Sequence, residues 1–346
     1  MEKEQMKKGA RKIVELCAGV KPGERVLIVT DTGIEYSIAQ ALYEAALACG
    51  GDAAVMLARP GEKPGEEPAP LTAAAMRAAD VILSPTTRTI FHSQAATQAL
   101  KAGARLLSLT EISEKILVSG GIDADFKALQ PRISWLREKF QKGGRARITA
   151  KNGTDITLDM TGRDAFACTG LCHEKGQRMG IPELEVFIAP IEGTSNGTLV
   201  IDACISGIGG VKDPVVITLK DGRLFAIKGG GEAERLLALL DASGDPACRV
   251  IAEFALGLND KARVIGDIIE DEGVYGTGHF AFGNNVHFGG ANPAPIHLDM
   301  VYWHPTVEID GQLVMRDGRL VGEPAECLTA APEEELAAGG GGQASL

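Results

Sequence analysis

The second half of the chain contains a short segment that pairs an imidazole with a carboxylate. Within 296–300, a β-strand would place His297 and Asp299 on one face, because alternate side chains of a strand point the same way. Divalent ions of hard or borderline character accept both kinds of ligand. A structural hydrogen bond between the two side chains is the alternative, and the pair alone does not decide between them.

Two further polar residues stand in apolar surroundings. Glu253 interrupts the apolar run 250–257, and a buried carboxylate costs free energy unless it is paired or bound to a cation. His279 lies between glycines and the apolar stretch 280–282, where a hydrogen-bonded core histidine is the alternative to a metal ligand.

Glu185 repeats the pattern more weakly in front of the apolar stretch 186–189, with Glu183 as a rival for its role. Together the candidates supply three carboxylates and two imidazoles, and a shared metal cluster explains all of them. The predicted metal ligands are Glu185, Glu253, His279, His297 and Asp299. Three negative ligands suit two divalent ions, because a bridging carboxylate offsets the repulsion between cations that lie about 3.5 to 4 Å apart.

The first part of the chain is expected to form a separate domain, and our hypothesis is that it covers the cavity and selects substrates. Its short β-prone segments are 26–30, 53–58, 81–84 and 106–109, separated by helical stretches such as 37–49. That alternation predicts a parallel α/β sheet. We expect Ser37 to cap the start of this helix and Gly50-Gly51 to end it. The Pro- and Gly-rich segment 59–70 is expected to be a surface loop, and its role as a lid is a hypothesis.

After a helix expected at 123–141, the chain becomes mainly β-prone, with one further helix expected near 232–240. The predicted strands are 145–149, 155–160, 186–189, 198–204 and 215–219, and Asp-Gly pairs at 221/222, 310/311 and 317/318 predict hairpins. We therefore predict an α/β protein with an N-terminal parallel-sheet α/β domain and a mainly β (α+β) C-terminal metal-binding domain. The predicted ranges are 1–145, 146–335 and, for a flexible tail, 336–346.

Composition excludes several classes of protein. Apolar residues make up 45% and charged residues 23%, as in soluble globular proteins. The net charge of −11 argues against a nucleic-acid partner, and no glycine-rich pattern for a nucleotide cofactor occurs. No apolar run approaches the roughly 20 residues that span a bilayer, and residues 1–12 lack the apolar core typical of a signal peptide, so we expect neither feature. With seven cysteines, an odd number, we expect a cytoplasmic protein without a membrane partner.

Three other motifs give weaker signals. The Cys168-x-x-x-Cys172-His173 motif lacks a second Cys/His pair for zinc, so we expect a loop near the mouth of the site. The segment 193–197 contains a serine but not the elbow of serine hydrolases, and 207–210 precedes a β pattern; both are expected to be turns.

Several segments occur in an order and spacing that are specific to one family. They are 182–190 followed by Glu192-Gly193 and Asn196-Gly197, then 253–257 with Asn259, the block 271–283 and the pair His297-x-Asp299. In these the chain resembles the thermophilic metallo-aminopeptidases of the aminopeptidase T and aminopeptidase S type.

The resemblance implies a homodimer that acts on a short peptide or another small molecule. It also implies that the five predicted ligands bind two zinc, cobalt or manganese ions, with Glu253 as the bridge. The reaction expected is amide hydrolysis by a water whose pKa the ions lower, with Glu185 or a nearby acid moving the proton.

One departure concerns the family's catalytic tyrosine, which has no counterpart here. The chain instead has 284–287, Asn-Asn-Val-His. His287 is our candidate electrophile or proton donor in its place, and an ordinary surface or core histidine is the alternative. A protein that binds a metal or ligand without catalysis is therefore a further hypothesis.

The chain also looks like the short 2,5-dihydroxypyridine ring-cleaving dioxygenases, which share this scaffold and bind one ferrous ion through two histidines and one carboxylate. Those enzymes have a histidine at the position of Glu253, and their positions matching Glu185 and His279 are not ligands. We therefore prefer the hydrolase and keep the Fe(II) dioxygenase as the alternative. In that case His279, His297 and Asp299 are the candidate facial triad.

Overall fold

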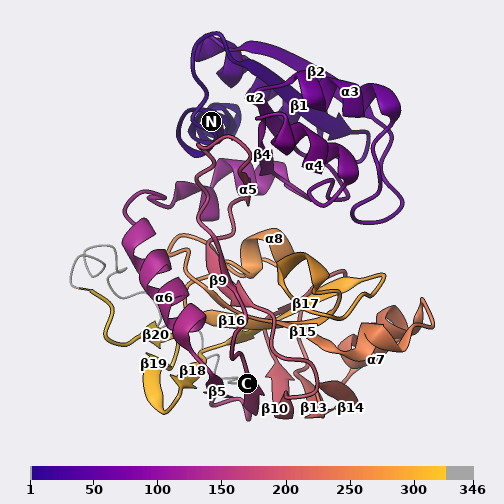
Figure 1. Cartoon of the computed structure of the whole chain (residues 1–346), viewed down its shortest axis with the longest axis vertical. Helices are drawn as coiled ribbons and strands as arrows, with labels where there is room; N and C mark the ends of the chain where they lie inside the picture. The colour runs from indigo at the N-terminus through magenta and orange to yellow at the C-terminus, as the bar shows by residue number, and fades with distance from the viewer. Residues whose placement is uncertain (1, 325–346) are drawn as a thin grey trace, which may run out of the picture.

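The computed structural model of the chain describes residues 2–324, so the predicted tail at 336–346 lies outside the described residues. The chain forms two lobes (Figure 1), of which the upper contains most of the first 120 residues. Parallel strands build one sheet and antiparallel strands build two others, which confirms the predicted α/β class. No helix in this part of the chain is long and apolar enough to cross a membrane.

The N-terminal sheet has the strand order β2-β1-β3-β4-β8, and all its neighbours are parallel. Its strands are β1 (Arg25–Asp31), β2 (Asp52–Ala58), β3 (Val81–Ser84), β4 (Arg105–Ser108) and β8 (Arg178–Gly180). Its helices are α1 (Glu2–Arg11), α2 (Tyr36–Ala48), α3 (Pro70–Ala78) and α4 (Gln94–Lys101), with a π-helical turn at Lys12–Cys17. The segment 59–69 between β2 and α3 has neither helix nor strand, as predicted, and its role as a lid stays a prediction.

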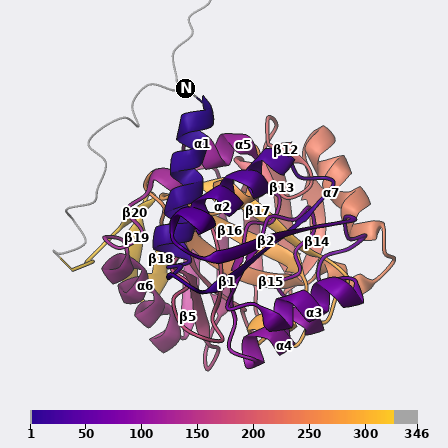
Figure 2. The same cartoon turned by 90° about the horizontal axis from the view of Figure 1, so that it is seen from above.

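The central strand β1 explains why the sheet is covered on both faces. Val26 and Ile28 belong to the hydrophobic cluster that includes α2, whereas Leu27 and Val29 pack with α3 and α4. Since side chains alternate along a strand, a strand that is apolar at consecutive positions must be buried on both sides. Figure 2 shows α1 and α2 on one side of this sheet and α3 and α4 on the other.

The helix predicted at 37–49 is α2, but its start differs from the prediction. Glu35 precedes the helix as its N-cap and gives no side-chain cap, so the predicted cap by Ser37 is wrong. The Ser37 hydroxyl lies inside the first turn and donates to the carboxylate of Glu114 instead. The end is as predicted: Gly50 has φ +78, which a residue without Cβ adopts at no steric cost.

The C-terminal lobe consists of two antiparallel sheets. One has the order β14-β13-β10-β6-β5-β18-β19-β20 and the other β12-β11-β17-β16-β15-β9-β7. The strands of the first are β5 (Arg145–Thr149), β6 (Asp155–Asp159), β10 (Asn196–Ile201), β13 (Val215–Lys220), β14 (Arg223–Lys228), β18 (Thr306–Ile309), β19 (Gln312–Arg316) and β20 (Arg319–Leu320). The strands of the second are β7 (Ala165–Cys168), β9 (Glu185–Ile188), β11 (Cys204–Ile205), β12 (Gly209–Gly210), β15 (Ile251–Gly257), β16 (Thr277–Gly283) and β17 (His297–Trp303).

The three predicted Asp-Gly hairpins are all present. Asp221, Asp310 and Asp317 have φ between 48 and 51, and the glycine after each also has a positive φ. Such pairs form the tight turns whose twist matches that of the flanking strands. The turns predicted at 193–197 and 207–210 are confirmed only in part: turns occur at 192–193 and 206–208, whereas Asn196-Gly197 begin β10 and Gly209-Gly210 form β12.

Helix α5 (Glu114–Val118) packs against α1 of the N-terminal lobe. The helices of the C-terminal lobe are α6 (Gln130–Lys142), α7 (Gly231–Asp241) and α8 (Ile268–Asp271). The helix predicted at 123–141 begins only at Gln130, after a short 3-10 turn at Gly121–Asp123. Helix α7 matches the helix predicted near 232–240.

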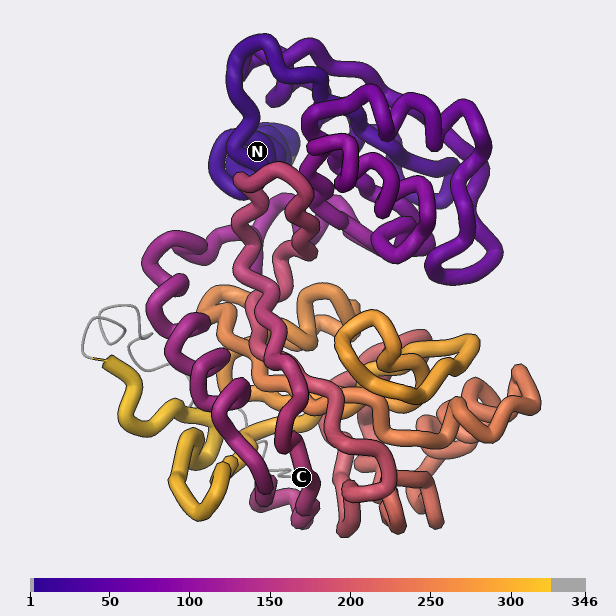
Figure 3. Tube along the Cα trace, viewed as in Figure 1, coloured from indigo at the N-terminus to yellow at the C-terminus, as the bar shows by residue number. Residues whose placement is uncertain are grey.

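One strand crosses from the C-terminal range into the N-terminal sheet. β8 pairs in parallel with β4, with Leu107 opposite Met179. In Figure 3 the pink segment accordingly rises from the lower lobe into the upper one and returns. A single boundary at residue 145 does not account for this strand, and the predicted division into domains stays a prediction.

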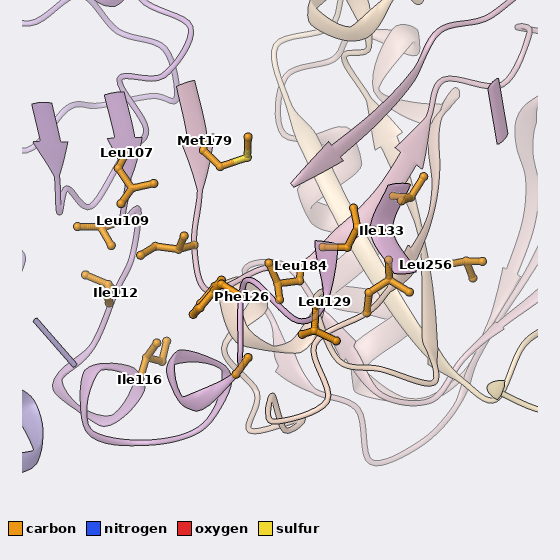
Figure 4. Packing of buried hydrophobic residues seen from close by; sticks show 14 of the residues in the cluster. Leu107, Leu109, Ile112, Ile116, Phe126, Leu129, Ile133, Met179, Leu184 and Leu256 are labelled. Atoms are coloured by element: carbon orange, nitrogen blue, oxygen red, sulfur yellow. The ribbon is translucent and has the colours of Figure 1, made fainter. Parts of the chain in front are cut away.

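The hydrophobic core is continuous between the lobes. One cluster extends from Leu107 at the N-terminal sheet, past Phe126 and Leu184, to Leu256 on β15 (Figure 4). Phe126 and Leu184 are fully buried. The two sheets are therefore joined by packed apolar side chains as well as by the polypeptide chain.

Candidate metal centre

The five predicted ligands lie on neighbouring strands of one sheet. In the order β17-β16-β15-β9, these strands contribute His297 and Asp299, then His279, then Glu253, and last Glu185. Opposite residues of paired strands point to the same face. Because Glu253 lies opposite Ala281 and Ala281 opposite Asp299, the two carboxylates project on one face.

The register places the remaining ligands on the same face. His279 lies opposite Ala255, two residues from Glu253, and Glu185 lies opposite Gly257. His297 lies opposite Gly283, which is four residues from His279 on β16. Since alternate residues of a strand share a face, His297 and His279 project on the same side of the sheet. The strand register shifts between Ile251 and Glu253, beside the site, and such irregularities commonly redirect a side chain.

The side chains converge around two histidine nitrogens. His297 Nε2 lies 3.2 Å from Glu253 Oε2 and 3.2 Å from Asp299 Oδ1. His279 Nε2 lies 3.4 Å from Glu185 Oε2 and 3.5 Å from Glu253 Oε1. Glu253 thus presents one oxygen to each imidazole, and its role as a bridging ligand, which the resemblance implies, stays a prediction.

Ligand atoms within 4.8 Å of one another form three groups of three in the described residues: Glu185, Glu253 and His279; Glu253, His297 and Asp299; and Glu272, His279 and Asp299. None of these groups contains both histidines, so the described geometry gives no support to the triad His279, His297 and Asp299. Whether the five residues bind metal stays a prediction.

One side of the centre is closed and the other is open. Glu185, Glu253 and His279 are at most 6% exposed, whereas the side chain of His297 is 32% exposed and that of Asp299 14%. A molecule from solvent would therefore reach the centre from the side of His297.

Two observations indicate that the donors suit a cation. Glu185 Oε2 and His279 Nδ1 are buried without a hydrogen-bond partner in the described residues, which is costly for polar atoms. His297 Nδ1 lies 2.7 Å from the carbonyl oxygen of Asn284. A proton on Nδ1 would make that bond and leave Nε2 free as a ligand, the arrangement common for metal-binding histidines.

The electrostatics of the centre favour positive charge. Burial lowers the pKa of His279, but Glu185, Glu253 and Asp299 outweigh burial and raise that pKa to about 9. Burial raises the pKa of Glu185 and of Glu272 well above the usual range, since the neighbouring carboxylates add to its effect. The field that holds protons on the imidazoles is the field that would hold a metal cation in their place.

Sequence reasoning missed Glu272 as a possible ligand. The residue follows α8 and joins the group formed with His279 and Asp299. Its only sequence signal was its place at the start of the block 271–283. The rival acid Glu183 is in none of the three groups and accepts a hydrogen bond from Cys168 Sγ at 3.7 Å.

His287, the predicted proton donor, lies outside the three groups. Its ring stacks on that of His92 from the N-terminal lobe, with 4.1 Å between centroids and 13° between planes. Burial lowers the pKa of His287, and Arg178 and His297 lower it further. Its catalytic role stays a prediction.

The cysteine motif does not form one loop at the mouth of the site. Cys168 ends β7 opposite Glu185, but Cys172 is buried against β4, with its Sγ 3.4 Å from the carbonyl oxygen of Leu106. His173 Nε2 contacts the carbonyl oxygen of Leu16 at 2.7 Å. The prediction is therefore wrong for the second half of the motif, which turns toward the N-terminal lobe because β8 follows it.

Residues 5–322 match the family model of 2,5-dihydroxypyridine 5,6-dioxygenase. The chain belongs to this family. Within the family's fold, it is similar to the structure of 2,5-dihydroxypyridine dioxygenase from Pseudomonas putida KT2440, with 21% identity and a TM-score of 0.80 over 94% of this chain and 99% of the other. No curated protein sequence matches the chain.

A second solved structure with this fold is wild-type AmpT from Thermus thermophilus. The chain is 18% identical to it, with a TM-score of 0.66 over 93% of this chain and 100% of the other. At such identities both likenesses show the fold alone. The shared scaffold of our two resemblances is thus confirmed, and the family match corrects our preference between them, because it favours the dioxygenase over the hydrolase.

Proposed function

We propose that this chain is a metal-dependent dioxygenase that opens a hydroxylated pyridine-type ring. The observation that carries the proposal is the match of residues 5–322 to the 2,5-dihydroxypyridine 5,6-dioxygenase family. The reaction adds both atoms of O2 to the ring, so it needs no external reductant.

The group Glu253, His297 and Asp299 would hold the ion through one imidazole and two carboxylates, with Glu253 at the position where the resemblance places a histidine in the dioxygenases. Although burial raises the pKa of both carboxyls, the histidines outweigh burial and keep these pKa values below the usual range, so both stay ionised. When bound, a ferrous ion supplies the one-electron chemistry through which a ring reacts with O2. The exposed side of His297 leaves room for the ring to approach.

A second candidate, a metal-dependent amide hydrolase, is favoured by one specific feature of the donor set. The group Glu185, Glu253 and His279 shares Glu253 with the first group and would provide a second ion position. Two neighbouring positions joined by a carboxylate are the arrangement in which two ions activate water.

Metal content and oxygen dependence test the proposal. Protein purified without chelator and without oxygen is analysed for metals per chain and then mixed with a panel of hydroxypyridines. We expect about one iron per chain and loss of the ring absorbance only when O2 is admitted. Two zinc, cobalt or manganese ions per chain, with oxygen-independent cleavage of aminoacyl amides, would overturn the dioxygenase in favour of the hydrolase.

Three glutamine variants sharpen the test. Glu253→Gln should lose all metal under either candidate, because its carboxylate belongs to both groups. Glu185→Gln should keep one ion per chain in the dioxygenase but lose one of two in the hydrolase. Glu183→Gln, also at a buried position but in none of the groups, is the matched control and should keep the wild-type metal content.

A further inference from the structure

Arg178 differs from the other arginines that are buried or half-buried in the described residues. Four such arginines each form an ion pair with a carboxylate: Arg105 with Glu24, Arg132 with Glu323, Arg163 with Glu192, and Arg249 with Asp241. Arg178, at the start of β8, has no carboxylate within ion-pair distance in this part of the chain. Burial of the unpaired guanidinium lowers its pKa. A desolvated cation without a counter-ion costs free energy unless a ligand supplies the anion.

Within residues 2–324, only one of the five N–H groups of the Arg178 guanidinium has a hydrogen-bond partner. Nη1 donates to the carbonyl oxygen of Phe91 at 2.9 Å, and the guanidinium lies over the Phe91 ring, 4.7 Å from its centroid. These contacts hold the planar group in one orientation. The remaining N–H groups still offer a parallel pair of donors, which matches the two oxygens of a carboxylate.

A chain of ring contacts connects Arg178 to the metal centre. The Phe91 ring lies 5.0 Å from that of His92, which stacks on His287. Next to His287, the ring of Phe288 makes an edge contact with His297, at 5.8 Å between centroids. The unpaired Arg178 guanidinium therefore lies near the solvent-exposed side of the candidate metal centre, where His297 lies.

The two histidines beside Arg178 add donors without adding charge. Burial lowers the pKa of His92 to about 3, so its imidazole is neutral at physiological pH. His92 Nδ1 is buried without a hydrogen-bond partner in the described residues. A neutral imidazole can donate one hydrogen bond to an anion, and the flat rings around it suit a flat aromatic molecule.

We propose that Arg178 is a binding residue for a carboxylate carried by the aromatic substrate, with His92 at the same subsite. The proposal rests on the proposed function in taking that substrate to be a hydroxylated pyridine-type ring. The centre itself is rich in carboxylates, which would repel the acid group of an anionic substrate. Arg178 lies outside the centre and would attract that group, so the substrate would bind with its acid group toward Arg178 and its ring toward His297.

Equilibrium binding without oxygen tests the proposal independently of turnover. The probes are pyridine-3-carboxylate and its neutral amide, titrated into the protein as purified and followed by calorimetry. We expect the wild type to prefer the acid. Arg178→Met should weaken binding of the acid about 10-fold to 100-fold, the range of a charge-assisted hydrogen bond, and change binding of the amide less than about twofold.

Two variants separate recognition from folding. Arg178→Lys keeps the charge but loses the fork, so its affinity for the acid should lie between those of the wild type and Arg178→Met. Arg88→Met is the matched control: Arg88 is an exposed arginine of the same lobe, paired with Glu111 at 2.8 Å, and its loss should leave both affinities unchanged. If Arg178→Met does not fold, Arg178→Gln provides the same comparison.

Equal affinity of the wild type for acid and amide, or an unchanged affinity for the acid in the folded Arg178 variant, would overturn the proposal. Failure of ring opening under O2 would instead count against the proposed function, because the binding experiment requires no reaction. With a carboxylated hydroxypyridine that turns over, the Arg178 variants should raise KM far more than they lower kcat.

Discussion

At the scale of single residues, the sequence identified side chains that interrupt buried strands. Glu253 and His279 were recognisable because burying a polar group in an apolar strand costs free energy unless the group is paired or bound to a ligand. Glu272 gave no such signal, since an acid at the end of a short helix is ordinary. Arg178 and His92 were missed because nothing in the spacing of the sequence shows that β8 joins the N-terminal sheet or that the two lobes meet at His287.

A residue-scale prediction concerns Asp80, which precedes β3. Its carboxylate accepts hydrogen bonds from the Arg25 side chain and backbone, and these lower its pKa from 3.8 to about 2. A group whose pKa is lowered on folding stabilises the protein above its unfolded pKa and loses that effect as the pH falls through the folded one. At pH 7, Asp80→Asn should therefore reduce the free energy of unfolding by up to about 1 kcal/mol, because the pair is partly exposed.

Urea titrations between pH 7 and pH 3 would check this prediction. The difference between wild type and variant should shrink once the pH falls below about 4. Asp52→Asn is the control, since Asp52 is an exposed acid on β2 that has no side-chain hydrogen bond or ion pair in the described structure. A difference that stayed constant down to pH 3 would contradict the assignment.

At the scale of elements, local patterns predicted most strands and all three hairpins, because their φ angles depend on the Asp-Gly pairs themselves. The start of α2 was not predictable in the same way. Ser37 is a good capping residue by type, but its hydroxyl donates to Glu114 of α5. That contact between distant segments occupies the hydroxyl expected to cap the helix, and no local pattern contains it.

The element-scale prediction concerns Gly257 at the end of β15, opposite Glu185. A Cβ there would lie 2.3 Å from the carbonyl oxygen of Val274 and 2.8 Å from that of Glu272. Gly257→Ala should therefore push the segment after α8 outward and cost about 1 to 3 kcal/mol of stability, as overpacking does. Denaturant unfolding would measure the loss.

Gly231→Ala is the matched control for Gly257→Ala. Gly231 begins α7, and a Cβ there would have no atom within 4 Å. Alanine favours a helix over glycine, so this variant should be neutral or slightly more stable than the wild type. A Gly257→Ala protein as stable as the Gly231→Ala protein would show that the strand end can adjust.

At the scale of the whole molecule, the continuous core between the lobes predicts a single unfolding transition. Because Leu184 is fully buried between the N-terminal sheet and β15, neither sheet keeps its core if the other unfolds. Calorimetry should show one transition with equal calorimetric and van't Hoff enthalpies. Leu184→Ala should lower the stability of the whole chain by about 2 to 5 kcal/mol.

Leu71→Ala provides the comparison for Leu184→Ala, since Leu71 is 74% exposed and should change stability little. Two resolved transitions, only one of them shifted by Leu184→Ala, would show that the lobes unfold independently. The homodimer and the cytoplasmic location stay predictions.

The sheet that carries the centre has an aromatic row, Phe254, Phe280 and Tyr302, with neighbouring ring centroids 5.2 and 6.0 Å apart. In β15 and β16, Phe254 and Phe280 each adjoin a ligand in sequence, so these rings occupy the face opposite to the donors. The candidate ligands therefore lie on strands whose opposite face is tightly packed, so the distances between the ligand atoms cannot change freely. A fixed cage distinguishes ions by radius, so we expect the centre to reject calcium, the largest of the common biological divalent ions, even when it is in excess.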